Sequence, residues 1–177
     1  MSSTASTSPV ATARLFIGLW PDDEVRAALL AHREDWRWPP SAVWMAPQRL
    51  HMTMHFLGMV PRDRVPLLRQ ALKLAVVPFD LSLDHGEVWH GGVAVLRPSE
   101  VPAALNALHD RLARALELIE QPTVRPELKP HLTLARHAQG ALPPKRSAQI
   151  HWRVARYALV ESIQQPPSRY EVLQEYG

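Results

Sequence analysis

Residues 50–56, LHMTMHF, and residues 130–136, PHLTLAR, share the pattern that decides the fold. In each stretch a histidine and a threonine stand two positions apart, separated and followed by apolar residues. Side chains at positions i and i+2 of a β-strand point to the same face, so each stretch is predicted to be a half-buried strand with one polar face. Each follows a helical segment and a loop, which predicts two related lobes that each contribute one such strand.

The segments around these two strands alternate between extended and helical patterns. Strands are predicted over residues 13–20, 49–56, 79–84, 87–90, 92–96, 130–135, 154–160 and 169–176. Helices are predicted to begin at Pro21, to cover residues 62–76, and to run from a cap at Ser99 to Glu120. Residues 58–61 and the pair Gly91-Gly92 are interpreted as turns. Because helices and strands mix without regular βαβ repetition, the predicted class is α+β.

Composition limits the possible classes of protein. The chain has 177 residues, which fits one bilobal domain over residues 14–177, preceded by a flexible tail over residues 1–13. There are no cysteines, which excludes disulfides, thiolate metal sites and a cysteine nucleophile. No apolar run approaches the ~20 residues that span a bilayer, and the tail lacks the basic and apolar parts of a signal peptide, so a cytoplasmic protein is expected. A net charge of +3 permits a polyanionic ligand without requiring one.

The two polar strand faces suggest chemistry at phosphorus. The candidate catalytic residues are His51 and His131, and the candidate phosphate-binding residues are Thr53 and Thr133. In-line displacement needs a base for the incoming water and an acid for the leaving oxygen, and imidazole serves in either role at neutral pH. Two hydroxyls can donate hydrogen bonds to the non-bridging oxygens as negative charge builds on them. The residues alone leave open which histidine is the acid, and a strained cyclic phosphate needs no metal or cofactor.

Arg136 and His55 are further candidates for contact with substrate. The Arg136 guanidinium can bind a phosphate bidentately, but strict alternation points it away from His131 unless the strand ends or bulges before it. His55 shares the predicted face of His51 and lies at its rim, whereas Phe56 is predicted to face the core. Four tryptophans fall in predicted loops, where an indole can stack on a base or pack into the core: Trp36, Trp38, Trp44 and Trp89.

At this point the motifs resemble the paired signatures of the two-histidine phosphoesterase superfamily. Within it they are most similar to the RNA 2′,3′-cyclic phosphodiesterases of bacteria and archaea, also called 2′-5′ RNA ligases. The resemblance runs from residues 14–21, RLFIGLWP, to residues 169–173, RYEVL. It implies two pseudo-symmetric lobes of antiparallel sheet with outer helices and an active-site groove between them. It also implies metal-independent hydrolysis of an RNA-terminal 2′,3′-cyclic phosphate to a 2′-phosphate, and the reverse 2′-5′ ligation.

The resemblance also implies a role for each matching residue. His51 would be the general acid on the leaving 3′ oxygen and His131 the general base on water, with Thr53 and Thr133 on the phosphate and Arg136 on the substrate. The chain departs from close relatives at position 55, which is commonly arginine, and over residues 87–98, where relatives often carry more basic residues. The expected partner is RNA with a cyclic phosphate end, or a related nucleotide, and the expected state is a monomer without an obligate protein partner.

Three alternatives remain open on the sequence. The same chemistry would serve a cyclic phosphodiesterase for small nucleotides or for ADP-ribose cyclic phosphate. A second alternative is an RNA-end binding module without turnover. The third is a metal hydrolase that uses His51, His55 and His131, although neither motif contains the helical His-x-x-x-His spacing or a nearby acid.

Overall fold

The computed structural model describes residues 11–124, 127–145 and 149–177. The larger sheet has eight strands in the order β10-β9-β1-β3-β7-β6-β5, with β2 paired to β7, and β4 and β8 form a second sheet. The strands are β1 (Thr12–Leu19), β2 (Val43–Trp44), β3 (Met52–Pro61), β4 (Phe79–Leu83), β5 (His85–Trp89), β6 (Val93–Arg97), β7 (Leu132–Arg136), β8 (Ile150–Val154), β9 (Tyr157–Ile163) and β10 (Arg169–Tyr176). The helices are α1 (Asp23–Glu34), α2 (Val65–Ala71) and α3 (Ala103–Leu118), with 3₁₀ turns η1 (Pro47–Arg49) and η2 (Arg62–Arg64). All the strand pairs are antiparallel, which confirms the α+β class.

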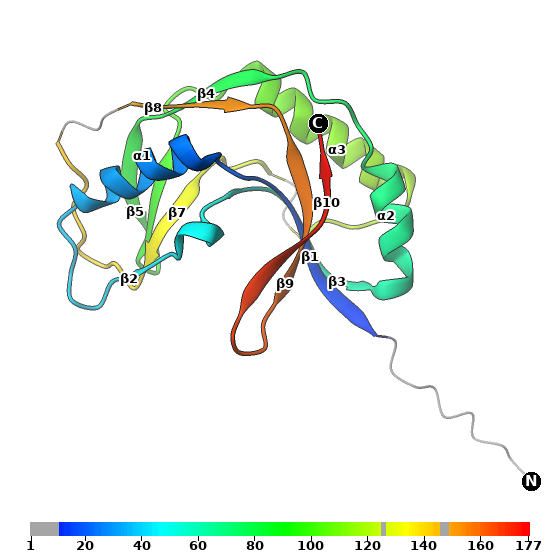
Figure 1. Ribbon diagram of the computed structural model, residues 1–177, viewed down its shortest axis with the longest axis horizontal. Coiled ribbons are helices and arrows are strands. Elements are labelled where there is room, and N and C mark those ends of the chain that lie inside the picture. The colour runs from blue at the N-terminus through cyan, green and yellow to red at the C-terminus, as the bar shows by residue number, and fades with distance from the viewer. Residues whose placement is uncertain (1–10, 125–126, 146–148) are drawn as a thin grey trace, which may run out of the picture.

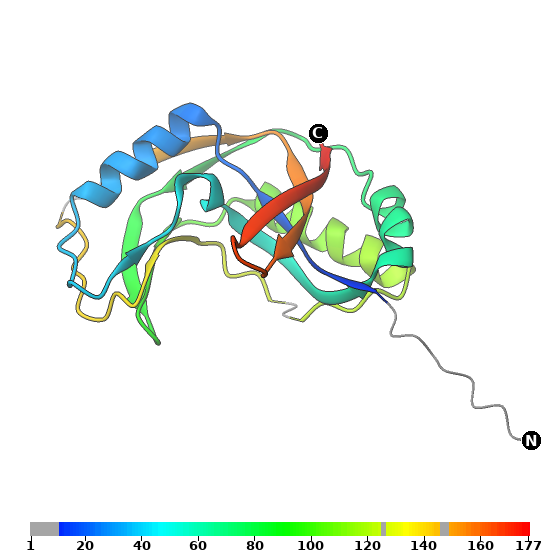
Figure 2. The same cartoon turned by 60° about the horizontal axis from the view of Figure 1, so that its bottom comes forward.

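The sheet divides into two lobes that meet where β3 pairs with β7 (Figure 1). Lobe 1 comprises β1, β3, β9 and β10 with α2 and α3, and lobe 2 comprises β2, β5, β6 and β7 with α1. Figures 1 and 2 show that the helices exchange lobes: α1 follows β1 but lies on lobe 2, and α3 follows β6 but lies on lobe 1. The exchange ties the lobes together, because each lobe also contains strands from both halves of the chain.

Helix α1 begins at Asp23, two residues after the predicted start at Pro21, for a local reason. The Asp22 carboxylate accepts a hydrogen bond of 2.8 Å from the Val25 backbone N–H, and two acids occupy the first turn near the positive end of the helix dipole. Helix α3 begins later than predicted, at Ala103. The backbone N–H and hydroxyl of Ser99 instead donate to the Asp84 carboxylate, and Pro102, the last residue before the helix, is itself in an extended conformation.

Strand β3 is longer than the sequence suggested. Residues 58–61 were expected to turn the chain, but β3 continues through them to Pro61 opposite the start of β1. Gly58, with φ of +73°, marks a β-bulge next to Leu57. Glycine favours both bulges and turns because it adopts positive φ without strain, so the residue type alone does not separate the two.

Three other expectations need correction. Helix α2 ends at Ala71, well before the predicted residue 76, and β8 was not predicted although its buried residues alternate with exposed His151 and Arg153. Strand β1 begins at Thr12, so residues 12 and 13 of the predicted tail belong to it; the first ten residues of that tail lie outside the described residues. Among the described helices, none is both long and apolar enough to cross a membrane.

Candidate active site

The two motif strands are neighbours in one sheet. Met52 pairs directly with Leu132, and both side chains are fully buried beneath the helices. The residues that flank them therefore point to the opposite face of the sheet, which we call the catalytic face. The same register sets His51 opposite Thr133 and His131 opposite Thr53, so each histidine of one strand stands beside the threonine of the other. Both predicted His-Thr pairs are thus brought together at the junction of the lobes.

Each imidazole ring is held in the same way. Nδ1 of His51 lies 2.7 Å from the Arg49 carbonyl oxygen, and Nδ1 of His131 lies 2.6 Å from the Lys129 carbonyl oxygen. A carbonyl only accepts, so Nδ1 carries the proton in both rings and Nε2 is the nitrogen that takes up or delivers a further proton. The Thr53 hydroxyl lies 3.0 Å from Nε2 of His51 and, in this tautomer, donates to it.

An aromatic box encloses His51. The Trp20 ring stacks on the imidazole with centroids 5.0 Å apart and planes inclined by 14°, while Phe16 and Tyr170 contact it at 5.0 Å and 5.2 Å. Gly18 makes room for the indole, because a Cβ at this position would lie 2.9 Å from the Trp20 ring. Sequence reasoning missed Trp20 and Tyr170, since each lies far along the chain from the motif that it contacts.

This box changes the acidity of His51. Burial lowers the pKa of His51 from its usual 6.5 to about 4; the hydrogen bond to the Arg49 carbonyl opposes that shift, and the positive charges of His131, Arg49 and Arg136 add to it. In the protein without substrate, His51 is therefore neutral at physiological pH. Arg49 and Arg136 thus both place a positive charge near His51.

The surroundings of His131 are different. The Trp89 ring lies 4.4 Å from the imidazole, at the end of β5, so it belongs to the strand predicted over residues 87–90 and not to a loop. The Glu87 carboxylate accepts hydrogen bonds of 2.6 Å from the Trp89 indole N–H and from the Arg97 guanidinium, and the first of these is the main reason why the pKa of Glu87 is lowered. A fixed carboxylate therefore holds the indole that packs against His131.

A β-bulge follows each motif and decides where the next side chains point. In β7 the pairs with β6 jump from Thr133 to Ala135, so Leu134 is an extra residue and the alternation reverses. Leu134 and Ala135 are consequently both buried, and Arg136 returns to the catalytic face, where its charge acts on His51. Alternation predicted that Arg136 reaches the catalytic face only if the strand ends or bulges before it, and β7 contains such a bulge.

The prediction that His55 shares the face of His51 is wrong, because β3 also contains a bulge directly after its motif. The pairs of β3 with β1 jump from Thr53 to His55, so Met54 is the extra residue. His55 points into the core, where it is 1% exposed, donates from Nε2 to the His109 carbonyl of α3 at 2.9 Å, and stacks on the His109 ring at 4.1 Å. His55 therefore does not line the catalytic face, and the trio proposed for a metal hydrolase does not converge.

The bulge also moves Phe56 to the catalytic face, where it packs beside Phe16 rather than in the main core as predicted. The tryptophans predicted to lie in loops, other than Trp89, form a separate cluster on lobe 2. Trp36 is buried and stacks on Trp38, and Trp38 contacts the 40% exposed Trp44 edge to face. Trp44 lies in β2 and not in the predicted loop. The ring, hydrogen-bond and cation–π contacts of these three tryptophans are with one another, with His32 and with Arg33, and not with either motif histidine.

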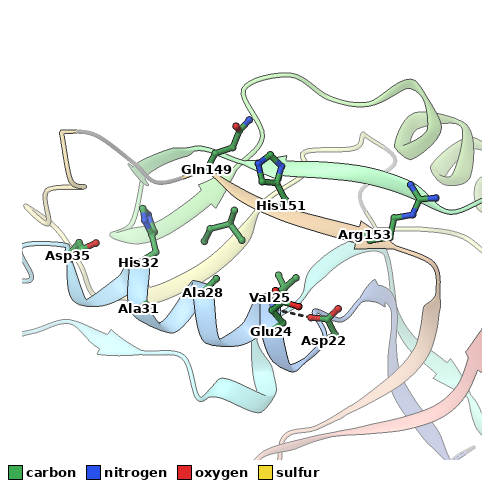
Figure 3. A pocket seen from close by; sticks show the side chains of 11 residues that line it. Asp22, Glu24, Val25, Ala28, Ala31, His32, Asp35, Gln149, His151 and Arg153 are labelled. Carbon is green, nitrogen blue, oxygen red and sulfur yellow. Dashed lines mark hydrogen bonds between the residues drawn. The ribbon is translucent and has the colours of Figure 1, made fainter.

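The hollow drawn in Figure 3 is not part of this site. It measures about 520 Å³ and lies between α1 and β8, on the helix side of lobe 2. Acidic side chains at the start of α1 line one end, and Arg153, which is paired with Asp80, lies on β8. None of the motif residues contributes to its lining.

Two histidine-threonine strands at the junction of two antiparallel lobes define a two-histidine phosphoesterase. The model of the 2′-5′ RNA ligase superfamily matches residues 21–165, so the chain belongs to this family. It is 30% identical to an RNA 2′,3′-cyclic phosphodiesterase of Thermus thermophilus over 93% of this chain and 89% of that protein. The fold is similar to that of E. coli LigT in its apo form (26% identity, TM-score 0.79, 93% and 96% of the two chains). It is also similar to E. coli LigT complexed with 3′-AMP (25% identity, TM-score 0.81, 93% and 97%).

Proposed function

We propose that this enzyme is a metal-independent RNA 2′,3′-cyclic phosphodiesterase that opens a terminal cyclic phosphate and leaves a 2′-phosphate. The observation that carries the proposal is the paired arrangement of His51 and His131, each with Nδ1 bound to a backbone carbonyl and each beside a threonine. The curated relative from Thermus thermophilus, whose name gives the same activity, supports it. The E. coli protein that was crystallised with 3′-AMP adds a relative that binds a nucleotide.

The site supplies a proton donor and a proton acceptor for in-line attack. Following the family resemblance, His131 takes the proton of the attacking water, and His51 gives a proton to the 3′ oxygen as its bond to phosphorus breaks. Thr53, Thr133 and Arg136 bind the non-bridging oxygens, on which negative charge builds in the transition state. In 2′-5′ ligation a 5′ hydroxyl takes the place of water: it loses its proton to His131 and attacks the cyclic phosphate, the bond from phosphorus to the 3′ oxygen breaks, and the 3′ oxygen takes a proton from His51.

The low pKa of His51 sets a requirement on this assignment. A neutral His51 cannot act as an acid, so the bound phosphate must raise its pKa by placing a negative charge beside the ring. Without substrate, the positive charges of Arg49 and Arg136 oppose protonation of His51. A bound phosphate offsets these charges. Protonation of His51 is therefore coupled to substrate binding.

The central experiment uses an RNA that ends in a 2′,3′-cyclic phosphate and identifies the product. We expect a 2′-phosphate, at a rate that 10 mM EDTA leaves unchanged. His51→Ala and His131→Ala should each lower kcat by about 10²–10⁴-fold, the usual contribution of one acid or base. Formation of a 3′-phosphate would reverse the leaving group, and the absence of any product would leave a binding module as the function.

A second experiment separates the acid from the base. In a substrate whose bridging 3′ oxygen is replaced by sulfur, the leaving thiolate needs no protonation, so an acid is dispensable. We expect His51→Ala to recover most of its lost activity on this substrate and His131→Ala to recover none. Recovery by His131→Ala alone would exchange the two roles while leaving the reaction class intact.

A further inference from the structure

We propose that lobe 1 binds the unpaired nucleotides that precede the cyclic end of the RNA, along a strip formed by Arg14, Trp20, Arg49, Phe56 and Tyr170. The proposal rests on the function proposed above and deepens it, because it makes an oligonucleotide the preferred substrate over a mononucleotide. We call these five residues the lobe-1 strip. All five side chains are partly exposed.

Strand register places the strip on the catalytic face. Gly18 lies opposite Thr53, and Phe16 lies opposite Phe56, so Phe16 and Phe56 share the face of the reactive threonine. Arg14 belongs to the same face, since its guanidinium donates to the Ser162 hydroxyl and lies over the Phe56 ring, 4.7 Å from its centroid. The strip therefore continues without interruption from His51 along β1.

The strip has the chemistry that single-stranded RNA requires. Arg49 lies over the Tyr170 ring at 4.6 Å and donates to the Ser168 hydroxyl, which repeats the arrangement of Arg14 on Phe56. In the part of the chain that the structure describes, neither arginine forms an ion pair with a carboxylate. Aromatic faces stack on unpaired bases of any identity, and arginines beside them attract the phosphates between the bases.

Charge distinguishes the two directions in which the RNA could leave the site. On lobe 2 the Trp89 ring packs against His131, and its indole N–H donates to the Glu87 carboxylate. That carboxylate would repel a phosphate, and Arg97 is already paired with it. On lobe 1 the neighbours of His51 are Arg49 and the rings of Phe16, Trp20 and Tyr170, with Arg14 further along β1. Arg136 of lobe 2 is assigned to the reacting phosphate itself. An RNA whose terminal phosphate lies between the histidines is therefore drawn over lobe 1.

The length of the strip fits several nucleotides. Gly18, which lies opposite Thr53, and Arg14 are four positions apart along β1. Four positions correspond to about 13 Å of strand. Stacked bases are about 3.4 Å apart, so there is room for roughly three nucleotides before the cyclic end. A mononucleotide would not reach Phe56 or Arg14.

The test compares kcat/KM for adenosine 2′,3′-cyclic phosphate with that for a tetranucleotide that ends in the same nucleotide. We expect the wild-type ratio of tetranucleotide to mononucleotide to exceed tenfold, the effect of about one stacked base. Phe56→Leu, which removes the ring but keeps an apolar side chain, should lower the ratio by about tenfold. Arg14→Gln, which keeps part of the aliphatic stem, should lower the salt dependence of the tetranucleotide reaction, reducing the slope of log kcat/KM against log salt by about 0.7.

Arg114→Gln is the matched control for Arg14, because Arg114 is an exposed arginine of α3, on the helix side of lobe 1. It should leave both the ratio and the salt slope at wild-type values. A wild-type ratio near one, with the mononucleotide still turned over, would overturn the strip and leave the proposed function standing. A ratio that Phe56→Leu leaves unchanged, together with a salt slope that Arg14→Gln leaves unchanged, would also overturn it. If neither substrate reacts, the proposed function fails and the strip fails with it.

Discussion

A single backbone carbonyl two residues upstream holds the imidazole of each motif histidine and fixes its tautomer. The sequence predicted His51 and His131 as the reactive pair, because alternation around a histidine and a threonine is visible in single-letter code. It did not predict the carbonyls, since hydrogen bonds to the backbone depend on how the chain bends before each strand. Arg49 supplies one of these carbonyls and also a positive charge near His51, so it belongs to the site although no motif marked it.

The pKa of His51 leads to a testable pH dependence. Because kcat/KM reports groups of the enzyme without substrate, the acid limb of its pH profile should lie near pH 4 rather than near 6.5. Trp20→Ala should open the aromatic box to water and move this limb toward 6.5, since burial is the main cause of the lowered pKa. Trp38→Ala removes a tryptophan from the separate lobe-2 cluster and should leave the limb in place. A wild-type acid limb at pH 6.5 would contradict the burial of His51.

At the scale of the elements, two β-bulges decide which residues reach the site. Strict alternation predicted Thr53 and Thr133 on the reactive face, and the structure places both beside the histidines. The same alternation placed His55 on that face and Phe56 in the core, and both expectations were wrong because an extra residue reverses the pattern after Thr53. A bulge depends on how the neighbouring strand pairs, which is information that a single strand does not contain.

The β5–β6 hairpin, which carries Trp89, offers a test of how the tip of lobe 2 is held. Gly92 has φ of +74°, and a Cβ there would lie 2.4 Å from the Gln139 side chain, whereas Gly91 has φ of +81° and no atom within 4 Å. Both Gly91→Ala and Gly92→Ala should lose about 1–2 kcal/mol of stability to the left-handed backbone. Gly92→Ala should lose more, because Gln139 must also move.

Urea unfolding of the two variants measures this difference. Adding Gln139→Ala to Gly92→Ala removes the side chain that the new Cβ would meet, and should bring the loss back to that of Gly91→Ala. Equal losses for the two single glycine variants would show that Gln139 does not pack against the tip of the hairpin.

For the molecule as a whole, the sequence predicted the class, the two lobes and most strands. It did not predict that α1 lies on lobe 2 and α3 on lobe 1, because amphipathic helices show which face is buried but not which sheet buries it. The exchange matters for the site. Helix α3 covers β3, the strand that follows His51, and its His109 packs on His55. A helix from a distant part of the chain therefore supports the strand beside His51.

That packing predicts how the protein responds to acid. Burial is the main cause of a lowered pKa for His32, His51 and His55. For each of them the unfolded chain, with a pKa near 6.5, binds a proton more readily than the folded protein. The free energy of unfolding should therefore be constant above pH 6.5 and fall below it, with each histidine contributing a slope of at most about 1.4 kcal/mol per pH unit.

His55→Phe isolates one of these contributions, because the new ring can still stack on His109 but cannot be protonated. Urea unfolding between pH 7.5 and 4.5 should give a shallower slope for this variant than for the wild type, by up to the contribution of one histidine. His90→Gln is the control: it removes an exposed imidazole at the β5–β6 turn and should leave the slope unchanged. If His55→Phe retains the full slope, protonation of His55 does not limit stability in acid.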